Sequence, residues 1–188
     1  GCTSEPVAEA DEVIDDFERP DNPDVGNGWN VNSGSWSISA GEAKIAGGGG
    51  SAWATMSKDV GYRKTFDFRL RFRAISGEPV FCVNGNGGPY NSDSHFDGGL
   101  CVYFTGVQSV RLLRGDPVGG GVFTTLVDTP VTLASGVDYF VRLTFDGSLL
   151  AARLWKTSDP EPAQPLISAV TTNVAPEKNT DVVLASDH

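Results

Sequence analysis

The hydrophobic and polar residues of this chain alternate with a period of two in many short segments. In the segment 65–75, TFDFRLRFRAI, every second residue from Phe66 to Phe72 is apolar, and the residues between them are charged. An extended chain places alternate side chains on opposite faces, so this pattern predicts a half-buried antiparallel strand. No stretch of a dozen residues shows the period of a helix.

Turn signals separate these segments and predict hairpins. Asp146-Gly147 interrupts the alternating segment 138–157, DYFVRLTFDGSLLAARLWKT, and Ala40-Gly41 lies near the centre of 35–47. Further strands are expected within 51–60, 79–85, 98–106, 109–115, 122–133, 165–173 and 180–188. Many short strands without helices predict an all-β, two-sheet antiparallel jelly-roll sandwich.

The chain of 188 residues is expected to hold one domain. Residues 1–13 are acidic, contain Ala and Pro, and lack a periodic apolar pattern, which is typical of a leader or linker. The expected sandwich therefore covers residues 14–188.

The segment 15–47 resembles the opening of concanavalin A-like or laminin-G-like jelly-roll domains. In that family an Asp-Asp-Phe strand precedes a Gly-x-x-Trp turn and a Gly-x-Trp-x-Ile-x-x-Gly hairpin. The matching residues here are Asp15, Asp16, Phe17, Arg19, Gly28, Trp29, Gly34, Trp36, Ile38 and Gly41. The resemblance extends less specifically from Val13 to Leu184 and implies the same sandwich fold.

Within this family the chain is similar to modules of phage minor tail proteins and of secreted bacterial carbohydrate-binding proteins. In such modules the first strand often pairs with a last strand of the type Val-Arg-Phe-Asp-Asp-Phe. The segment 180–188, TDVVLASDH, matches the strand before that one, and the sequence then stops. The resemblance therefore implies that the domain lacks its last strand or borrows it from elsewhere.

Charge narrows the possible partners. The formal net charge is −10 and the pI is about 4.5, which argues against nucleic acid or an anionic membrane as the partner. No apolar run approaches the roughly 20 residues that cross a bilayer. The start GCTSEP matches a bacterial lipoprotein cleavage site, with Cys2 as the lipidated residue; a free cysteine is the favoured alternative.

The other two cysteines, Cys82 and Cys101, lie in apolar segments that are expected to form strands. They are interpreted as buried thiols that behave as small hydrophobic side chains. A disulfide between them is the alternative if the two strands are neighbours.

The sequence favours a protein that is not an enzyme. Glycanases with this fold carry their paired acids in a Glu-x-Asp-x-x-Glu pattern, which this chain does not contain. It also lacks a Gly-x-Ser-x-Gly or His-Glu-x-x-His motif.

The segment 84–99, NGNGGPYNSDSHFDGG, is the preferred binding site. It combines aromatic rings, which stack on sugar rings, with amides and a carboxylate, which hydrogen-bond to sugar hydroxyls, and loops on rigid sandwiches often carry function. The candidate ligand-binding residues are Asn84, Asn86, Tyr90, Asn91, Asp93 and His95. The alternative is a solvated hairpin loop whose Phe96 packs against the edge of the core.

Two acidic segments could bind Ca²⁺, which takes six to eight oxygen ligands from carboxylates, amides and carbonyls. The candidate ligands are Asp15, Asp16, Asp21, Asp93 and Asp97. The alternative is that these residues are ordinary turn formers, because Asp hydrogen-bonds to its own backbone.

Together these features predict a non-catalytic binding or adhesion module, outside the cell or on a phage tail, that recognises cell-envelope glycan. The first alternative is an architectural domain held by neighbouring virion or assembly proteins, and a glycoside hydrolase is the second. Trp53 and Trp155 are expected in the core, and the row Arg69, Arg71 and Arg73 is expected on a solvated face paired with acids.

Overall fold

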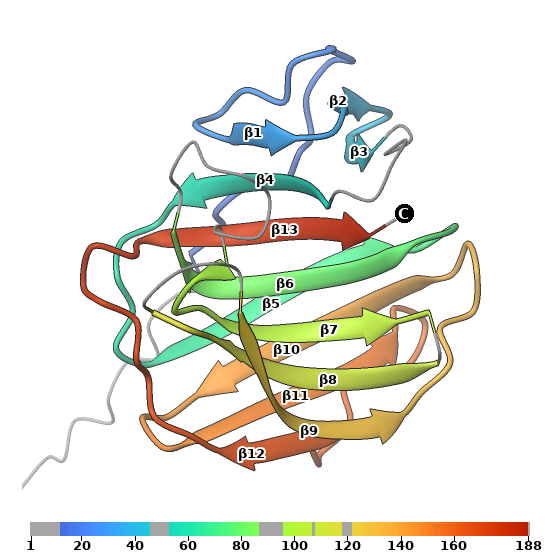
Figure 1. The fold of residues 1–188 in the computed structure, drawn as a ribbon. Helices are drawn as coiled ribbons and strands as arrows, with labels where there is room; N and C mark the ends of the chain where they lie inside the picture. Colours follow the sequence, from blue (N-terminus) through green and yellow to red (C-terminus); the bar gives the residue numbers. More distant parts are fainter. Residues whose placement is uncertain (1–11, 46–52, 87–95, 107, 118–121, 188) are drawn as a thin grey trace, which may run out of the picture.

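The chain folds into two antiparallel sheets that pack face to face (Figure 1). This computed structural model describes residues 12–45, 53–86, 96–106, 108–117 and 122–187. The larger sheet has seven strands in the order β1-β4-β13-β6-β7-β8-β9, and the smaller sheet has four in the order β12-β11-β10-β5. A separate hairpin, β2-β3, completes the fold. The expected jelly-roll sandwich is confirmed.

The strands follow the segments predicted from the alternation. Their bounds are β1 Asn30–Ser33, β2 Trp36–Ser39, β3 Glu42–Ile45, β4 Ala54–Asp59, β5 Phe66–Arg73, β6 Glu78–Gly85, β7 Leu100–Thr105, β8 Ser109–Gly115, β9 Phe123–Pro130, β10 Asp138–Phe145, β11 Leu149–Lys156, β12 Ile167–Val170 and β13 Asp181–Asp187. Only the short strand β1 falls in a segment for which no strand was expected. Within the described residues the chain forms no α-helix, so no helix there could span a membrane.

The clearest predicted hairpin forms as expected. In β10, Tyr139, Val141, Leu143 and Phe145 are all buried, and they alternate with half-buried residues. Val141, Leu143 and Phe145 face the larger sheet and form the core with residues such as Met56, Val102, Leu112 and Leu184. The apolar residues at every second position of β10 therefore make the hydrophobic contact between the two sheets.

One segment near the start differs from the family pattern. The residues Asp15 to Phe17 do not form a strand, and Phe17 has a positive φ of 57°. The segment is held by polar side chains, described below, instead of by a ladder of backbone hydrogen bonds.

The C-terminal strand β13 lies inside the larger sheet. It pairs with β4 on one side, where Leu184 lies opposite Met56, and with β6 on the other, where Leu184 lies opposite Phe81. Its backbone groups are thus used on both sides. The expectation that the domain lacks or borrows a last strand, and the division at residue 13, stay predictions.

The β2-β3 hairpin contains a turn residue that is poorly suited to its backbone. Ser39 pairs with Glu42, which leaves a two-residue turn of Ala40 (φ 53°) and Gly41 (φ 71°). Two positive φ values define a type I′ turn, which prefers Asn-Gly, and a left-handed conformation costs about 1 kcal/mol for a residue with a Cβ.

We therefore expect Ala40→Asn to raise the free energy of unfolding by about 0.5–1 kcal/mol. Ala40→Val is the opposing variant, because a β-branched residue tolerates positive φ least. Urea titrations of both variants check the prediction. Equal effects of the two substitutions would contradict it.

Cys82 and Cys101 form a disulfide, so the interpretation as free thiols is wrong. The two residues lie directly opposite each other on β6 and β7, with their Cα atoms 4.1 Å apart. The sequence showed that both segments were strands but did not show that they pair in this register. Around the disulfide lies a second apolar cluster, on the face of the larger sheet that points away from the smaller one: Val80, Phe96, Leu113, Val183 and Ala185.

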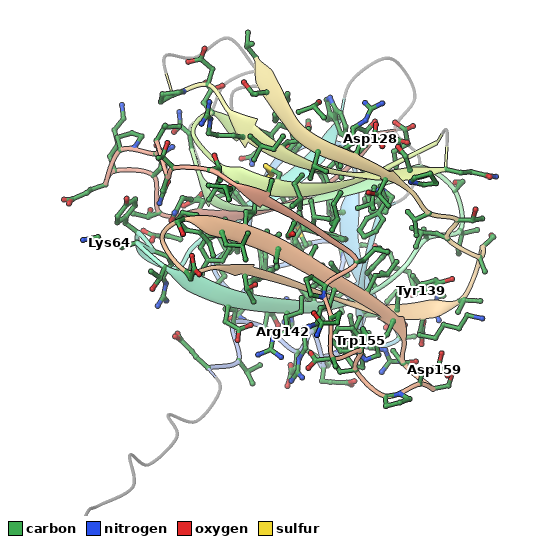
Figure 2. All side chains as sticks on the ribbon, turned by 90° about the horizontal axis from the view of Figure 1, so that it is seen from below. Lys64, Asp128, Tyr139, Arg142, Trp155 and Asp159 are labelled. Atoms are coloured by element: carbon green, nitrogen blue, oxygen red, sulfur yellow. A yellow bond between two sulfur atoms is a disulfide. The ribbon has the colours of Figure 1, made fainter. Side chains whose placement is uncertain are left out.

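The outer face of the smaller sheet is covered in part by the connection between β11 and β12, residues 157–166. Arg142 bonds to Glu161 of this connection at 2.9 Å and to Asp67 of β5 at 2.6 Å. Trp155, only 8% exposed, contacts Phe140 on the same face. Figure 2 shows Arg142 and Trp155 on the opposite side of the sandwich from Asp128. Trp155 is thus buried, although outside the main core.

The arginine row of β5 is paired largely as expected. Arg71 forms an ion pair with Asp138 at 2.6 Å, and Arg73 forms one with Glu42 at 2.5 Å. Arg69 lies over the ring of Phe140, with its guanidinium carbon 5.7 Å from the ring centroid. The row therefore takes part in a network that joins β5 to β10 and to β3, and it is not a stripe of isolated cations.

Candidate functional site

The first predicted site residue, Asn84, has a structural role. It is 1% exposed and has a positive φ of 58°. Its Oδ1 accepts a hydrogen bond from the amide of Arg63 at 2.8 Å, and its Nδ2 donates to the carbonyl of Arg63 at 2.7 Å. Both polar atoms of the side chain are engaged, so Asn84 anchors the β6 end of the segment and does not face a ligand.

The other end of the segment, residues 96–99, is anchored by the buried Asn179. The Nδ2 of Asn179 donates to the carbonyls of Asn84 (3.2 Å) and Asp97 (2.7 Å), which joins the two ends. Gly98 has a φ of +77°, and a Cβ there would lie 2.8 Å from Nδ2 of Asn179. Only glycine suits this position, because a side chain would meet both the backbone restriction and this contact.

Of the remaining predicted ligand residues, the structure describes only Asn86. Tyr90, Asn91, Asp93 and His95 lie outside the described residues. Asn86 is half-buried, directly after β6. The assignment of these residues to a binding loop stays a prediction.

Aromatic side chains gather beside the described end of this segment, on the outer face of the larger sheet. Phe96 is buried over the disulfide cluster, 5.7 Å from Trp53 and 5.3 Å from Phe123 between ring centroids. Trp53 also contacts Tyr103 of β7 at 5.5 Å. Trp53, Tyr103 and Phe123 are each half-buried, so part of each ring reaches solvent. The expectation that Phe96 packs at the edge of the core fits this arrangement.

Polar groups border the aromatic rings on the same face. Tyr103 lies opposite Arg111 of β8, which lies opposite Asp128 of β9. Nε of Arg111 donates to Asp128 Oδ2 at 2.8 Å, and this hydrogen bond lowers the pKa of Asp128. The hydroxyl of Tyr103 donates to Glu78, whose other oxygen accepts from the amide of Gly106.

This face has the chemistry of a sugar-binding surface. The rings of Trp53 and Tyr103 offer apolar faces, and Arg111 and Asp128 offer charged hydrogen-bonding groups at their side. Tyr103, Arg111 and Asp128 come from the strands β7, β8 and β9, whose backbone is fixed by the sheet, and Trp53 directly precedes β4. Most of these groups are therefore held in place before a ligand arrives. We name the surface of Trp53, Tyr103, Arg111 and Asp128 the outer-face site.

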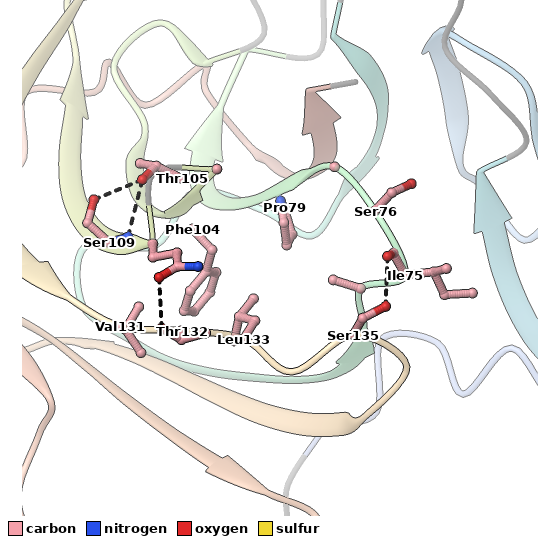
Figure 3. Close-up of a pocket in the computed structure, with 14 residues that line it drawn as sticks. Ile75, Ser76, Pro79, Phe104, Thr105, Ser109, Val131, Thr132, Leu133 and Ser135 are labelled. Atoms are coloured by element: carbon pink, nitrogen blue, oxygen red, sulfur yellow. Dashed lines mark hydrogen bonds between the residues drawn. The ribbon is translucent and has the colours of Figure 1, made fainter.

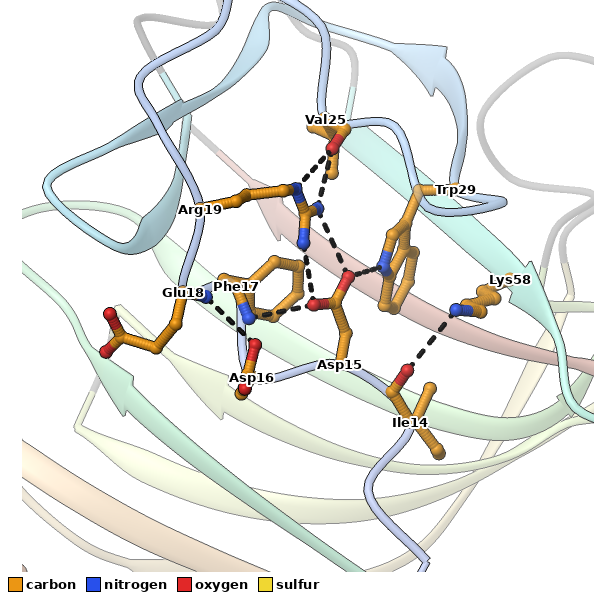
Figure 4. A network of polar contacts seen from close by, with 9 residues as sticks. All are labelled: Ile14, Asp15, Asp16, Phe17, Glu18, Arg19, Val25, Trp29 and Lys58. Carbon is orange, nitrogen blue, oxygen red and sulfur yellow. Dashed lines mark hydrogen bonds and ion pairs between the residues drawn. The ribbon is translucent and has the colours of Figure 1, made fainter.

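The acidic segment near the start does not form the expected calcium site. Asp15, whose side chain is 2% exposed, receives hydrogen bonds on both carboxylate oxygens (Figure 4). Arg19 Nη1 and the Phe17 amide donate to Oδ1, each at 2.8 Å, and Trp29 Nε1 donates to Oδ2 at 2.8 Å. A carboxylate surrounded by N–H donors and a guanidinium has no oxygen directed at a cation.

The electrostatics of Asp15 agree with this structural role. Burial alone would raise the pKa of Asp15, but the hydrogen bonds from Arg19, Phe17, Asn27 and Trp29 outweigh it. The pKa is thereby lowered from 3.8 to about 2. Asp15 is the charged centre of a polar cluster that also fixes Val25, whose carbonyl accepts from Arg19 Nη2 at 2.6 Å.

The other predicted calcium ligands do not join Asp15. Asp16 accepts from the amide of Glu18 at 3.0 Å, and Asp21 accepts from the amide of Ala40 at 2.8 Å. Asp97 is buried in the segment that precedes β7, and Asp93 lies outside the described residues. Within the described ranges no three His, Cys, Asp or Glu side chains form a group that could hold a metal ion. The turn-forming alternative therefore describes Asp16, whereas Asp21 holds the distant turn of the β2-β3 hairpin.

Sequence reasoning missed most of the outer-face site. Tyr103 and Arg111 stood in apolar strand segments, and Trp53 was assigned to the core. A signal was present: Leu100, Val102 and Phe104 alternate with Cys101 and Tyr103, which places Tyr103 on the opposite face from the core. The partners of that face could not be predicted, because they depend on the order of the strands.

The fold is shared with proteins of several kinds. Neither the protein-family models nor the curated proteins contain a match to this chain. Among solved structures, the carbohydrate-binding module CBM66 from Bacillus subtilis aligns with a TM-score of 0.57 at 9% identity, over 84% of this chain and 86% of that module. The exoplasmic/lumenal domain of VIP36 in its Ca²⁺-bound form aligns at 0.62 and 10% identity, over 93% and 82%.

A third similar structure is the CBM2 module of the evolved Dit of Lactobacillus casei BL23 phage J-1. It aligns with a TM-score of 0.52 at 13% identity, over 92% of this chain and 84% of that module. At these identities the likeness establishes the fold. The chain has a concanavalin A-like jelly-roll fold, as the resemblance in its opening segment implied.

Proposed function

We propose that this chain is a non-catalytic glycan-binding module and that glycan contacts the outer-face site. The observation that carries the proposal is the placement of Trp53 and Tyr103, in ring contact, beside the Arg111–Asp128 ion pair on one sheet face. The names of two structural neighbours agree with it: CBM66 is a carbohydrate-binding module, and VIP36 was also solved with Ca²⁺ and Man3GlcNAc.

A lowered pKa keeps a carboxylate charged at neutral pH, and a charged carboxylate accepts hydrogen bonds from hydroxyl groups. The described carboxylates with a resolved shift are Asp15, Asp67, Asp128 and Asp146, and in each the pKa is lowered. These groups are suited to accept hydrogen bonds as anions.

The module is proposed to act outside the cell, either on a phage tail or on a secreted bacterial protein, where it meets cell-envelope glycan. The resemblance of the opening segment and the likeness to the phage Dit module support this setting. We do not propose nucleic acid as a partner, because the net charge of the chain is −10. Anchoring through a lipid on Cys2 is the less favoured arrangement.

We expect Trp53→Ala to weaken binding to a recognised bacterial envelope polysaccharide by about tenfold, because an aromatic contact contributes roughly 0.5–1.5 kcal/mol beyond its buried area. The measurement is a titration of the purified domain against a polysaccharide panel. Val170→Ala, at an 81% exposed position on the smaller sheet, is the control.

The same titration tests the loop and the metal. If residues 86–95 also contact glycan, Tyr90→Ala and Asp93→Ala weaken binding as Trp53→Ala does, and a chelator has an effect only if calcium takes part. Binding that survives Trp53→Ala unchanged would overturn the outer-face site. If no polysaccharide binds, with or without the chelator, an architectural domain held by protein contacts would be favoured.

A further inference from the structure

A separate cavity opens at the opposite end of the sandwich from Asn84 and residues 96–99. It lies where the β5-β6 turn, the β7-β8 turn and the segment that follows β9 meet, and it has a volume of about 210 Å³ (Figure 3). Phe104 of β7, which is 3% exposed and in ring contact with Phe72, lines it together with Val131 and Leu133. These three residues belong to the main core or pack against it.

The backbone around this cavity is fixed. The amide of Val131 donates to the carbonyl of Gln108 at 2.9 Å, and the amide of Gly136 donates to the carbonyl of Ala74 at 2.9 Å. These bonds tie the segment after β9 to the two turns. A cavity with such a frame is formed before a ligand arrives, which lowers the cost of binding.

Hydroxyl and amide groups make up the polar part of the lining. Thr105 and Ser109 share a hydrogen bond at 2.8 Å, and the Ser135 hydroxyl donates to the carbonyl of Ile75 at 2.9 Å. Thr132 donates to Oε1 of Gln108 at 3.4 Å. This bond turns the other end of the amide, Nε2, away from Thr132, and Nε2 donates to no group in the part of the chain that the structure describes.

Gln108 itself stands at an unusual position. Its φ is +61°, a conformation that glycine adopts freely and that costs a residue with a Cβ about 1 kcal/mol. The residue is exposed and its side chain adds nothing to the core. The short turn between β7 and β8 accounts for this φ. The turn also places the amide of Gln108 at the mouth of the cavity, where it can hydrogen-bond to a ligand.

The chemical character of the lining limits the ligand. All fourteen lining residues are uncharged, although at the chain's average of 20% charged residues about three of them would be charged. A lining without charge offers no counter-ion and favours a neutral ligand. The volume is below the roughly 300–1,000 Å³ of clefts for drug-sized ligands, so it suits a single ring.

We propose that this cavity binds one neutral sugar ring, free or at the end of a glycan chain. The ring's C–H groups would lie on Phe104, Val131 and Leu133, and its hydroxyls would meet the amide of Gln108 and the hydroxyls of Ser76 and Thr132. The proposal stands on this cavity alone and does not depend on the outer-face site.

The test is a titration of neutral monosaccharides followed by two-dimensional NMR of the intact domain. Glucose, galactose, mannose and N-acetylglucosamine are the probes, and glucuronic acid and glucosamine are the charged controls. We expect at least one neutral sugar to bind with a dissociation constant of about millimolar size, the range for a ligand of a dozen heavy atoms. Shifts in the amide signals of Thr105, Gln108 and Thr132 would locate it.

Gln108→Gly is the decisive variant. It removes the side-chain amide, and glycine is the residue that best tolerates the positive φ at this position. We expect it to weaken sugar binding at least tenfold without loss of folding, and Gln164→Gly, at an exposed position outside the cavity, to leave binding unchanged. Trp53→Ala should also leave it unchanged, which separates this site from the outer-face site. Binding of no neutral sugar, or equal binding by Gln108→Gly, would overturn the proposal.

Discussion

Replacement of both Cys82 and Cys101 by alanine is expected to lower the free energy of unfolding by about 3 kcal/mol. The disulfide closes a loop between residues that are 19 apart in sequence, and the loss of that constraint on the unfolded chain accounts for about this amount. For a domain of this size the midpoint of thermal unfolding should fall by roughly 10 °C. Calorimetry of the double variant measures both quantities.

The third cysteine gives a matched control for this prediction. Cys2→Ala removes a thiol without touching the disulfide and should leave the unfolding midpoint unchanged. Alkylation of the denatured wild-type chain should label one cysteine without reductant and three after reduction, as read by intact mass. Labelling of three cysteines without reductant would show that the bond does not form in solution.

The disulfide also shows where prediction from this sequence stops. The two-residue period of the segments around Cys82 and Cys101 indicates strands, and period-two patterns predict the β5 strand and the β10-β11 hairpin equally well. These patterns do not predict which strands are neighbours in the sheet. The order β13-β6-β7 depends on contacts between residues far apart in sequence, which local patterns do not contain.

The candidate site divides in the same way. Composition singled out residues 84–99 as polar and rich in amides, but the structure uses Asn84 to hold the backbone of Arg63. An asparagine in a turn is suited to either role, and only its burial distinguishes them. The outer-face site and the cavity each combine residues from several strands and turns, so neither forms a continuous motif in the chain.

The same reasoning explains the acidic opening segment. Asp15 and Arg19 are part of the resemblance to the jelly-roll family, and a calcium site was one interpretation of these acids. In the structure Asp15 forms an ion pair with Arg19 and does not bind a metal ion. The i, i+4 spacing of the two residues does not predict this ion pair, because the segment is not a helix. The resemblance thus predicted the fold correctly, while the function of the matching acid had to come from its contacts.

Asp15→Asn is expected to lower the free energy of unfolding by about 2–3 kcal/mol at neutral pH. The substitution leaves the Arg19 guanidinium without its charged partner and replaces an acceptor oxygen by an NH₂ group beside N–H donors. Asp16→Asn, which alters a neighbouring carboxylate with one local hydrogen bond, should cost less than about 0.5 kcal/mol. Urea titrations of the three proteins at pH 7 measure the differences.

The effect of Asp15 must also depend on pH in a defined direction. Its pKa is about 2 in the folded chain against 3.8 unfolded, so the unfolded state takes up the proton first as the pH falls. The stabilisation by the charged form is complete above about pH 5 and is lost as the pH falls through 2. The shift of nearly two pKa units corresponds to about 2 kcal/mol. The difference in unfolding free energy between wild type and Asp15→Asn should therefore shrink by about this amount between pH 5 and pH 2. A difference that stays constant over this range would mean that Asp15 acts through its shape and packing instead of its charge.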